Sequence, residues 1–307
     1  MSLLPEPCPP SSCSVTPVSG GITNALYLFK PCNGEGSSPL LVRLFGGEGM
    51  IDRDTETDTY AEMCAYLGRI TYLGRFGNGR VEGFLEGFKA CTLKEMRGLA
   101  VVKEVKKIHD FAKEGDLEVW DQFTTWVGEA EVAMKKDTCT AHEYLCKVDV
   151  ERVKSRLEEL KAAVPGLGLE PCFCHNDLLS GNILMSVEGD ARVYQVIDFE
   201  YGGVNYREFD IANHWNEYAG GTQNPDGIPD YSLLPDKEQR LLWLREYWAK
   251  EDVEKELKDV ETFMEINNYY WCLWAVVQSG NEGFEEFDYG RYAYERFIQG
   301  QKEGGFC

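Results

Sequence analysis

The residues best suited to chemistry lie between positions 172 and 210, in the stretch CFCHNDLLSGNILMSVEGDARVYQVIDFEYGGVNYREFD. Asp177 is followed five residues later by Asn182, in the pattern HxDxxxxN, and Asp198 opens an Asp-Phe-Glu triplet. Strand-forming residues on both sides of a Glu-Gly-Asp turn predict a hairpin between Asn182 and Asp198. Folding this hairpin about residue 190 places Asn182 and Asp198 side by side at its open end, with Asp177 just before them.

This arrangement fits phosphoryl transfer. An amide oxygen and a carboxylate form a hard pair of ligands for Mg²⁺, which bridges nucleotide phosphates. A separate carboxylate, such as that of Asp177, can accept the proton of an attacking hydroxyl. Short motifs arise by chance from residues that cap turns, but HxDxxxxN followed by a hairpin that ends in Asp-Phe-Glu is a specific combination.

The same stretch resembles the kinase-like phosphotransferases and, within them, the choline/ethanolamine kinase family. The resemblance extends from about Val18 to Phe297 and is strongest to ethanolamine kinases. It implies an α+β, protein-kinase-like bilobal fold with a small β-rich N-lobe, a larger helical C-lobe and ATP in the cleft. By this resemblance Asp177 is the catalytic base, and Asn182 and Asp198 are the catalytic residues that hold Mg²⁺. Protein kinases fit less well, because no long activation segment fits between Asp198 and the aspartate twelve residues later.

The elements that must position these residues change in character along the chain. The first third favours strands at 25–30 and 40–45, a hairpin over 70–84 and one helix at 51–67. After residue 86 the hydrophobic periodicity is helical, with long helical stretches at 117–133, 150–160, 238–248, 253–278 and 289–299. We therefore expect a loose arm over 1–17, an N-lobe over 18–86 and a helical C-lobe over 87–307.

A glycine pair precedes the first strand, where small residues let backbone amides approach phosphates closely. The resemblance places the phosphate loop here, and the residues that it assigns to the nucleotide are Gly20, Gly21, Ile22, Thr23 and Asn24. The segment around Glu82 and Phe84 matches the family's hinge, whose backbone would bind adenine. Ile197 is expected to line the adenine pocket, although strand packing explains that residue equally well.

Arg43 lies on the apolar face of the strand at 40–45, so it needs a charged partner. In the family this position contacts phosphate. Glu56, the acidic residue on the apolar stripe of the helix at 51–67, is its expected partner. Glu62 is the alternative, but it points to the opposite side of that helix.

The acceptor side is expected to be aromatic. Trp271 and Trp274 share one helical face, and aromatic faces attract an ammonium group while a carboxylate neutralises its charge. Core packing is the plain alternative for aromatics at this spacing. In the family, the positions that match Glu217, Trp271, Trp274, Phe287 and Tyr292 form the acceptor pocket.

Three local features resemble the ethanolamine branch: HNDLL at 175–179, NEYAG at 216–220 and DYSLLP at 230–235. A primary ammonium has three N–H donors, which Asn216 and Glu217 suit. A quaternary ammonium has none and relies on aromatic faces. An insertion at 221–229, between the matching segments, leaves the specificity open.

Composition limits the partners. Lys and Arg total 31 and Asp and Glu total 52, so the net charge is −21, which argues against nucleic acid and anionic membrane surfaces. The longest dense apolar run, at 269–277, is too short for a membrane span, and the first residues are not a secretory signal. The eleven scattered cysteines suggest free thiols in a reducing cytoplasm, and the four spread histidines argue against zinc.

We therefore expect a cytoplasmic kinase that uses ATP and Mg²⁺ to phosphorylate ethanolamine, with choline or dual specificity as the alternative. An aminoglycoside kinase on the same fold would also suit the acidic C-lobe, and a degenerate kinase could merely sense ammonium ligands. The sequence leaves open whether the chain forms a homodimer.

Overall fold

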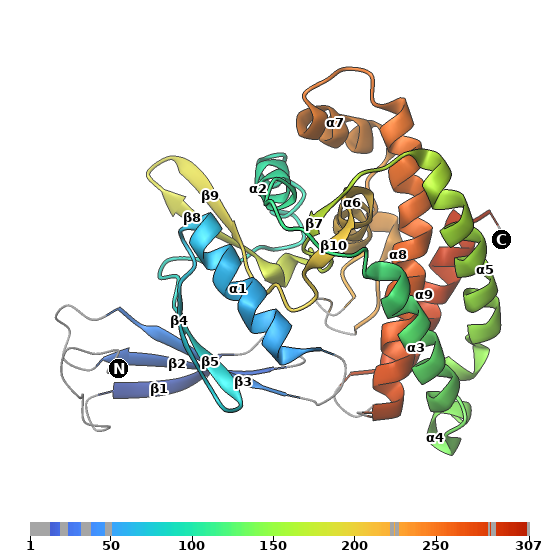
Figure 1. The fold of residues 1–307 in the computed structure, drawn as a ribbon, viewed down its shortest axis with the longest axis horizontal. Helices are drawn as coiled ribbons and strands as arrows, with labels where there is room; N and C mark the ends of the chain where they lie inside the picture. The colour runs from blue at the N-terminus through green and yellow to red at the C-terminus, as the bar shows by residue number, and fades with distance from the viewer. Residues whose placement is uncertain are drawn as a thin grey trace. The chain divides into compact units, whose positions relative to one another are not determined.

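The computed structural model describes residues 13–18, 24–31, 38–46, 51–221, 224, 227–281, 283 and 287–305. By its internal contacts the chain divides into two compact units. The first consists of residues 1–90 and 181–202, and the second of residues 91–180 and 203–307. Figure 1 shows the chain as a ribbon, with labels on its helices and on most of its strands.

The first unit is built on a five-stranded antiparallel sheet in the order β1-β2-β3-β5-β4. Its strands are β1 (Cys13–Val18), β2 (Asn24–Pro31), β3 (Leu40–Phe45), β4 (Tyr72–Phe76) and β5 (Gly79–Gly83). Helix α1 (Arg53–Leu67) begins at Asp52, whose side chain accepts hydrogen bonds from two backbone N–H groups, and ends at Gly68 with φ +72°. The strands and the helix confirm the elements expected in the first third of the chain.

Two segments are placed differently from the expected lobes. Residues 13–17, expected in the loose arm, belong to β1, where Pro17 is tolerated because β1 is an edge strand. The hairpin of β8 (Ile183–Glu188) and β9 (Ala191–Val196), expected with the helical C-lobe, belongs to the first unit. It does so because β6 (Lys89–Ala90) pairs with β8 in a three-stranded sheet of order β6-β8-β9.

The second unit is mainly helical, as expected after residue 86. Its helices are α2 (Ala100–His109), α3 (Val119–Ala133), α4 (Asp137–Thr140), α5 (Val150–Ala163), α6 (Arg207–Asn216), α7 (Lys237–Trp248), α8 (Glu254–Asn281) and α9 (Tyr289–Glu303). Helix α8 packs against α9, α6 and α3 (Figure 1). Tyr270 on α8 touches Phe123, Trp126 and Phe209, so aromatic packing fixes these helices around it.

A small two-stranded sheet holds the HND tripeptide in this unit. Strand β7 (Pro171–Cys174) pairs antiparallel with β10 (Gly203–Tyr206), and the tripeptide follows β7 directly. Helix α6 starts where β10 ends, which brings its first turns beside that tripeptide.

The described part of the chain holds no helix that is both long and apolar enough to pass through a membrane. Helix α8 has the length, at 28 residues, but it carries charged side chains such as Glu256, Lys258 and Glu261. The eight cysteines within the described ranges are free thiols.

Candidate active site

The β8–β9 hairpin brings Asn182 and the end of β9 together, but with a register one residue different from the expected one. The turn consists of two residues, Gly189 and Asp190, because Glu188 pairs with Ala191. The N–H of Ile197 donates to the carbonyl of Asn182 at 2.9 Å, so Asn182 lies opposite Ile197 and not opposite Asp198. Asp198 is the next residue, and its φ of +64° is a left-handed conformation that few residues other than glycine adopt.

Arg43 connects β3 to Asp198. Its Nη1 lies 3.0 Å from Asp198 Oδ1, and its Nε donates to Glu82 Oε1 at 2.9 Å. Arg43 is only 3% exposed. Burial alone would lower the pKa of Arg43, but the carboxylates of Asp198 and Glu82 raise it well above its ordinary value. The guanidinium therefore stays charged, and the need for a charged partner is confirmed.

The expected pair between Arg43 and Glu56 is wrong. Glu56 accepts instead from Arg80 Nη1 at 2.6 Å and from Arg53 Nη1 at 2.8 Å. Arg80 stands directly opposite Arg43 in the β3–β5 register, is fully buried, and reaches Glu56 on α1. Glu56 was correctly expected on the buried face of its helix. Its partner is Arg80, however, because the pairing of β3 and β5 places Arg80 within reach of it.

Glu200 adds a third carboxylate near the start of α1. It accepts from Asn24 Nδ2 at 3.0 Å and from Arg53 Nη1 at 3.3 Å. One oxygen each from Glu56, Asp198 and Glu200 lie within 4.8 Å of one another. Carboxylate oxygens are the hard donors that Mg²⁺ prefers, so this donor set fits that ion.

These residues form one network of alternating charge, which we call the carboxylate–arginine network. It contains Arg43, Arg53, Arg80, Glu56, Glu82, Asp198 and Glu200. Four carboxylates face three arginines, so one negative charge is left over. A divalent cation would turn this excess into a net positive charge, which suits a polyphosphate.

Of the other residues expected to bind the nucleotide, the structure describes Glu82 and Phe84 but not the glycine-rich segment. Gly20, Gly21, Ile22 and Thr23 lie outside the described residues. The Glu82 carboxylate is engaged by Arg43 and Arg80, at 2.9 and 2.6 Å. The N–H of Phe84 donates to the carbonyl of Pro39 at 3.2 Å.

In the second unit, Asp210 on α6 holds the HND tripeptide. Its two carboxylate oxygens accept from the backbone N–H groups of His175 at 2.7 Å and Asn176 at 2.6 Å. Asn176 has φ +66°, and its side-chain oxygen accepts from Asn205 Nδ2 at 2.8 Å. Burial would raise the pKa of Asp210, but its hydrogen bonds with the His109 ring and with the backbone N–H of His175 lower it below its ordinary value. An ionised Asp210 therefore fixes a strained turn.

Asp177 completes that turn. It is 8% exposed, and its N–H donates to His175 Nδ1 at 3.2 Å. The backbone around it is thus fixed on both sides, since the next N–H, of Leu178, donates to the side chain of Asn213. A carboxylate held this way is preorganised to accept a proton.

The predicted acceptor residues of the second unit do gather. Ring centroids lie 5.4 Å apart for Trp271 and Trp274, 6.3 Å for Trp274 and Tyr292, and 5.6 Å for Phe287 and Tyr292. Tyr289, which the sequence did not single out, joins the cluster, 5.6 Å from Trp274 and 5.0 Å from Phe287. We call these five residues the aromatic cluster.

Glu217 lies beside the aromatic cluster with a partner that the sequence did not reveal. Its carboxylate accepts from Arg296 Nη2 of α9, and Arg296 Nε donates to Tyr292 Oη at 3.0 Å. Glu217 and Arg296 are both buried, at 3% and 0% exposure. Burial raises the pKa of Glu217, and Arg296 opposes that rise. The negative charge of Glu217 is therefore already balanced within the protein.

The residues missed from the sequence share one property. Each depends on a partner far away in the sequence: Arg80 is 24 positions from Glu56, Arg53 is 147 positions from Glu200, and Arg296 is 79 positions from Glu217. An arginine in a strand opposite Arg43 could have been noticed only with the strand register in hand.

The family model of the choline/ethanolamine kinases matches residues 15–300. Probable choline kinase 3 of Arabidopsis thaliana is 32% identical, with 94% of this chain and 86% of that protein covered. Probable ethanolamine kinase of the same plant is also 32% identical, over 94% of this chain and 79% of that protein. The structure of an ethanolamine kinase from Plasmodium vivax superimposes with a TM-score of 0.81 at 24% identity, over 94% of this chain and 82% of that one.

These similarities confirm the expected α+β, protein-kinase-like fold with a small sheet-rich part and a larger helical part. They also confirm a phosphotransferase that uses an alcohol group as acceptor. Relatives named for choline and for ethanolamine are equally similar, so the identities do not distinguish the two acceptors. By its sequence and its fold, the chain belongs to the choline/ethanolamine kinase family.

Proposed function

We propose that this kinase transfers the γ-phosphoryl group of ATP, bound with Mg²⁺, to the hydroxyl of ethanolamine and forms phosphoethanolamine in the cytoplasm. Choline is the alternative acceptor. Ethanolamine is favoured over choline by one buried hydrogen-bond acceptor, the side-chain oxygen of Asn216, the residue next to Glu217.

Asn216 is fully buried at the end of α6. Its Nδ2 donates to the carbonyl of Met264 at 3.2 Å and to Asn267 Oδ1 at 3.0 Å. Its Oδ1 has no hydrogen-bond donor among the described residues. An acceptor of this kind is costly to leave unsatisfied, and a primary ammonium brings N–H donors that choline lacks.

The position of Asn267 ties this acceptor to the aromatic cluster. Asn267, Trp271 and Trp274 are spaced i, i+4 and i+7 on α8, so they share one face of that helix. The indole faces attract the positive charge of either amino alcohol by cation–π contact. Because Arg296 balances Glu217, we infer that hydrogen bonding, more than net charge, separates ethanolamine from choline here.

Phosphoryl transfer itself needs a base, a metal site and a positive charge on the phosphates, and different residues supply each. Asp177 accepts the proton of the acceptor hydroxyl as the oxygen attacks phosphorus. Asn182, Asp198 and Glu200 would hold the metal, which when bound neutralises charge on the transferring phosphoryl group. Arg43, fixed by Glu82 and Asp198, supplies a further positive charge to the phosphates.

The experiment compares two acceptors in one variant. Asn216→Leu removes the unsatisfied oxygen, and its structural cost falls on both acceptors alike. We expect kcat/KM for ethanolamine to fall relative to choline by roughly 5–30-fold, the equivalent of about 1–2 kcal/mol for a buried hydrogen bond. Product identity is checked by ³¹P NMR of the reaction with ATP, Mg²⁺ and ethanolamine. An unchanged ratio of the two kcat/KM values would contradict the assignment of Asn216.

A further inference from the structure

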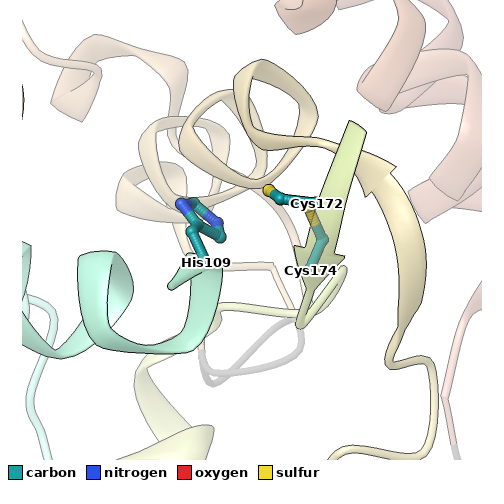
Figure 2. A group of neighbouring side chains, drawn as sticks. All are labelled: His109, Cys172 and Cys174. Carbon is teal, nitrogen blue, oxygen red and sulfur yellow. The ribbon is translucent and has the colours of Figure 1, made fainter. Parts of the chain in front are cut away.

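A second group of ligating side chains lies in the helical unit, on elements that carry no substrate-binding role. His109 is the last residue of α2, and Cys172 and Cys174 lie two positions apart on β7, which directs both to one face of the strand. One ligand atom from each of these three residues lies within 4.8 Å of the other two (Figure 2). His109 and Cys174 are buried, and Cys172 is half-buried.

We propose that His109, Cys172 and Cys174 form a binding site for a thiophilic divalent cation, Zn²⁺ in preference to Mg²⁺. Thiolate and imidazole are the ligands that zinc takes in proteins, whereas Mg²⁺ requires oxygen. The site is separate from the carboxylate–arginine network, which belongs to the first unit and offers only oxygen ligands.

The spacing of the sulfur atoms supports a metal more than a disulfide. Two thiolates bound tetrahedrally at about 2.3 Å from zinc are separated by about 3.8 Å. Cys172 Sγ and Cys174 Sγ are 3.8 Å apart. A disulfide would need the sulfurs at about 2.05 Å, between Cα atoms that an extended strand holds about 6.6 Å apart, near the upper limit for such a bond.

The charges of such a site balance. As the two S–Zn bonds form, the two S–H protons pass to solvent, so that two thiolates offset the charge of Zn²⁺. The imidazole of His109 adds a neutral third ligand. A water molecule can take the fourth position from the half-buried side, at Cys172.

The surroundings of His109 supply an outer shell. Its Nε2 lies 3.0 Å from Asp210 Oδ2, and its Nδ1 lies 2.7 Å from Tyr247 Oη. Ligation through either ring nitrogen replaces the hydrogen bond of that nitrogen and leaves the other in place, and ligation through Nδ1 keeps the one to Asp210, as is usual for metal-bound histidines. Asp210 also holds the amides of His175 and Asn176, so an ion at this site shares a carboxylate with the turn that carries Asp177.

The test is a titration of the full-length, reduced protein with Cd²⁺ alone, and then with Co²⁺ alone. Saturable thiolate-to-metal absorption at one equivalent, with a Co²⁺ visible spectrum typical of tetrahedral sulfur coordination, is the expected result. Cys172→Ser should weaken binding by more than the roughly 10–100-fold that loss of an outer-shell partner costs. Cys172→Val, which suits a strand and offers no ligand, is the second variant.

The matched control is Cys146→Ser, because Cys146 is an exposed free thiol on a different segment. It should bind Cd²⁺ as the unmodified protein does. An unchanged melting temperature and unchanged phosphotransferase activity without added Cd²⁺ would show that the Cys172 variants fold. Retained high-affinity binding in both Cys172 variants, or its loss in Cys146→Ser, would overturn the proposal whatever the acceptor of the kinase is.

Discussion

Arg43 and Arg80 face each other across β3 and β5, and one oxygen of Glu82 accepts a hydrogen bond from the Nε of each. Like charges directly opposite in a sheet repel each other, so two buried arginines at this position need a carboxylate between them. Glu82, two residues beyond Arg80 on the same strand face, supplies it. The arrangement presents a fixed guanidinium, Arg43, to Asp198.

Replacing Arg80 tests whether the carboxylate–arginine network is needed for folding. Arg80→Met leaves Glu56 and Glu82 buried with fewer positive partners, which should lower the free energy of unfolding by about 3–5 kcal/mol. Urea denaturation followed by fluorescence measures the change. The control is Arg75→Met, since Arg75 pairs with Asp54 at the surface and such pairs contribute about 0–1 kcal/mol. Equal losses in the two variants would contradict the role of the network.

Replacing Asp177 tests the proposed base. Asp177→Asn keeps the size of the side chain but removes its ability to accept a proton, so kcat should fall by roughly 10²–10⁴-fold. The melting temperature should stay unchanged, because the backbone of the turn is held by Asp210. Asp190→Asn, in the exposed turn of the β8–β9 hairpin, is the control and should keep full activity. Full turnover by Asp177→Asn would rule out the assignment.

Replacing Glu200 tests the metal site. Glu200 is held by Asn24 and Arg53 beside Asp198, so Glu200→Gln should raise the Mg²⁺ concentration for half-maximal activity by at least the roughly 10–100-fold that loss of an outer-shell partner costs. Titration of activity with Mg²⁺ at fixed ATP gives this value. Glu188→Gln, a change at an exposed residue of β8, should not alter it. The assignment fails if the two variants have the same Mg²⁺ requirement.

His214 gives the protein an acid-sensitive core. Burial lowers its pKa from 6.5 to about 4, so the folded state keeps the ring neutral while the unfolded chain takes up a proton. The contribution of the neutral His214 ring to the free energy of unfolding is fully present above pH 6.5. It is lost as the pH falls towards 4, and the total loss is about 3 kcal/mol. Urea denaturation between pH 4 and 7 should show this slope, and His214→Gln should flatten it. Parallel curves for the two proteins would be the contrary result.

The sequence predicted the strands, the long helices and the shared face of Trp271 and Trp274, because hydrophobic period and turn chemistry act locally. The grouping of these tryptophans with Phe287 and Tyr292 came from the family resemblance, and Tyr289 was missed. It placed Asn182 opposite Asp198 by centring the hairpin on Asp190. The actual two-residue turn, with Gly189 at φ +62°, shifts the pairing by one position. A single residue of loop length therefore decides which side chains meet.

Charge partners were harder to predict than elements. The burial of Arg43 and of Glu56 follows from their apolar neighbours, but their pairing depends on the register that puts Arg80 across from Arg43. Arg296 neutralises Glu217 from α9, 79 positions later in the chain. Such pairs become visible only when distant elements are packed, as is also true of His109 and the two cysteines of β7.

The decisive measurement of the acceptor is kcat/KM for ethanolamine and its N-methylated forms up to choline, measured as ADP release with ATP and Mg²⁺. We expect kcat/KM to be highest for ethanolamine and to fall with each methyl group, as N–H donors to Asn216 are lost. A rise towards choline would contradict the acceptor assignment while leaving the family and the chemistry in place. The absence of turnover with every member of the series would contradict the proposed reaction itself.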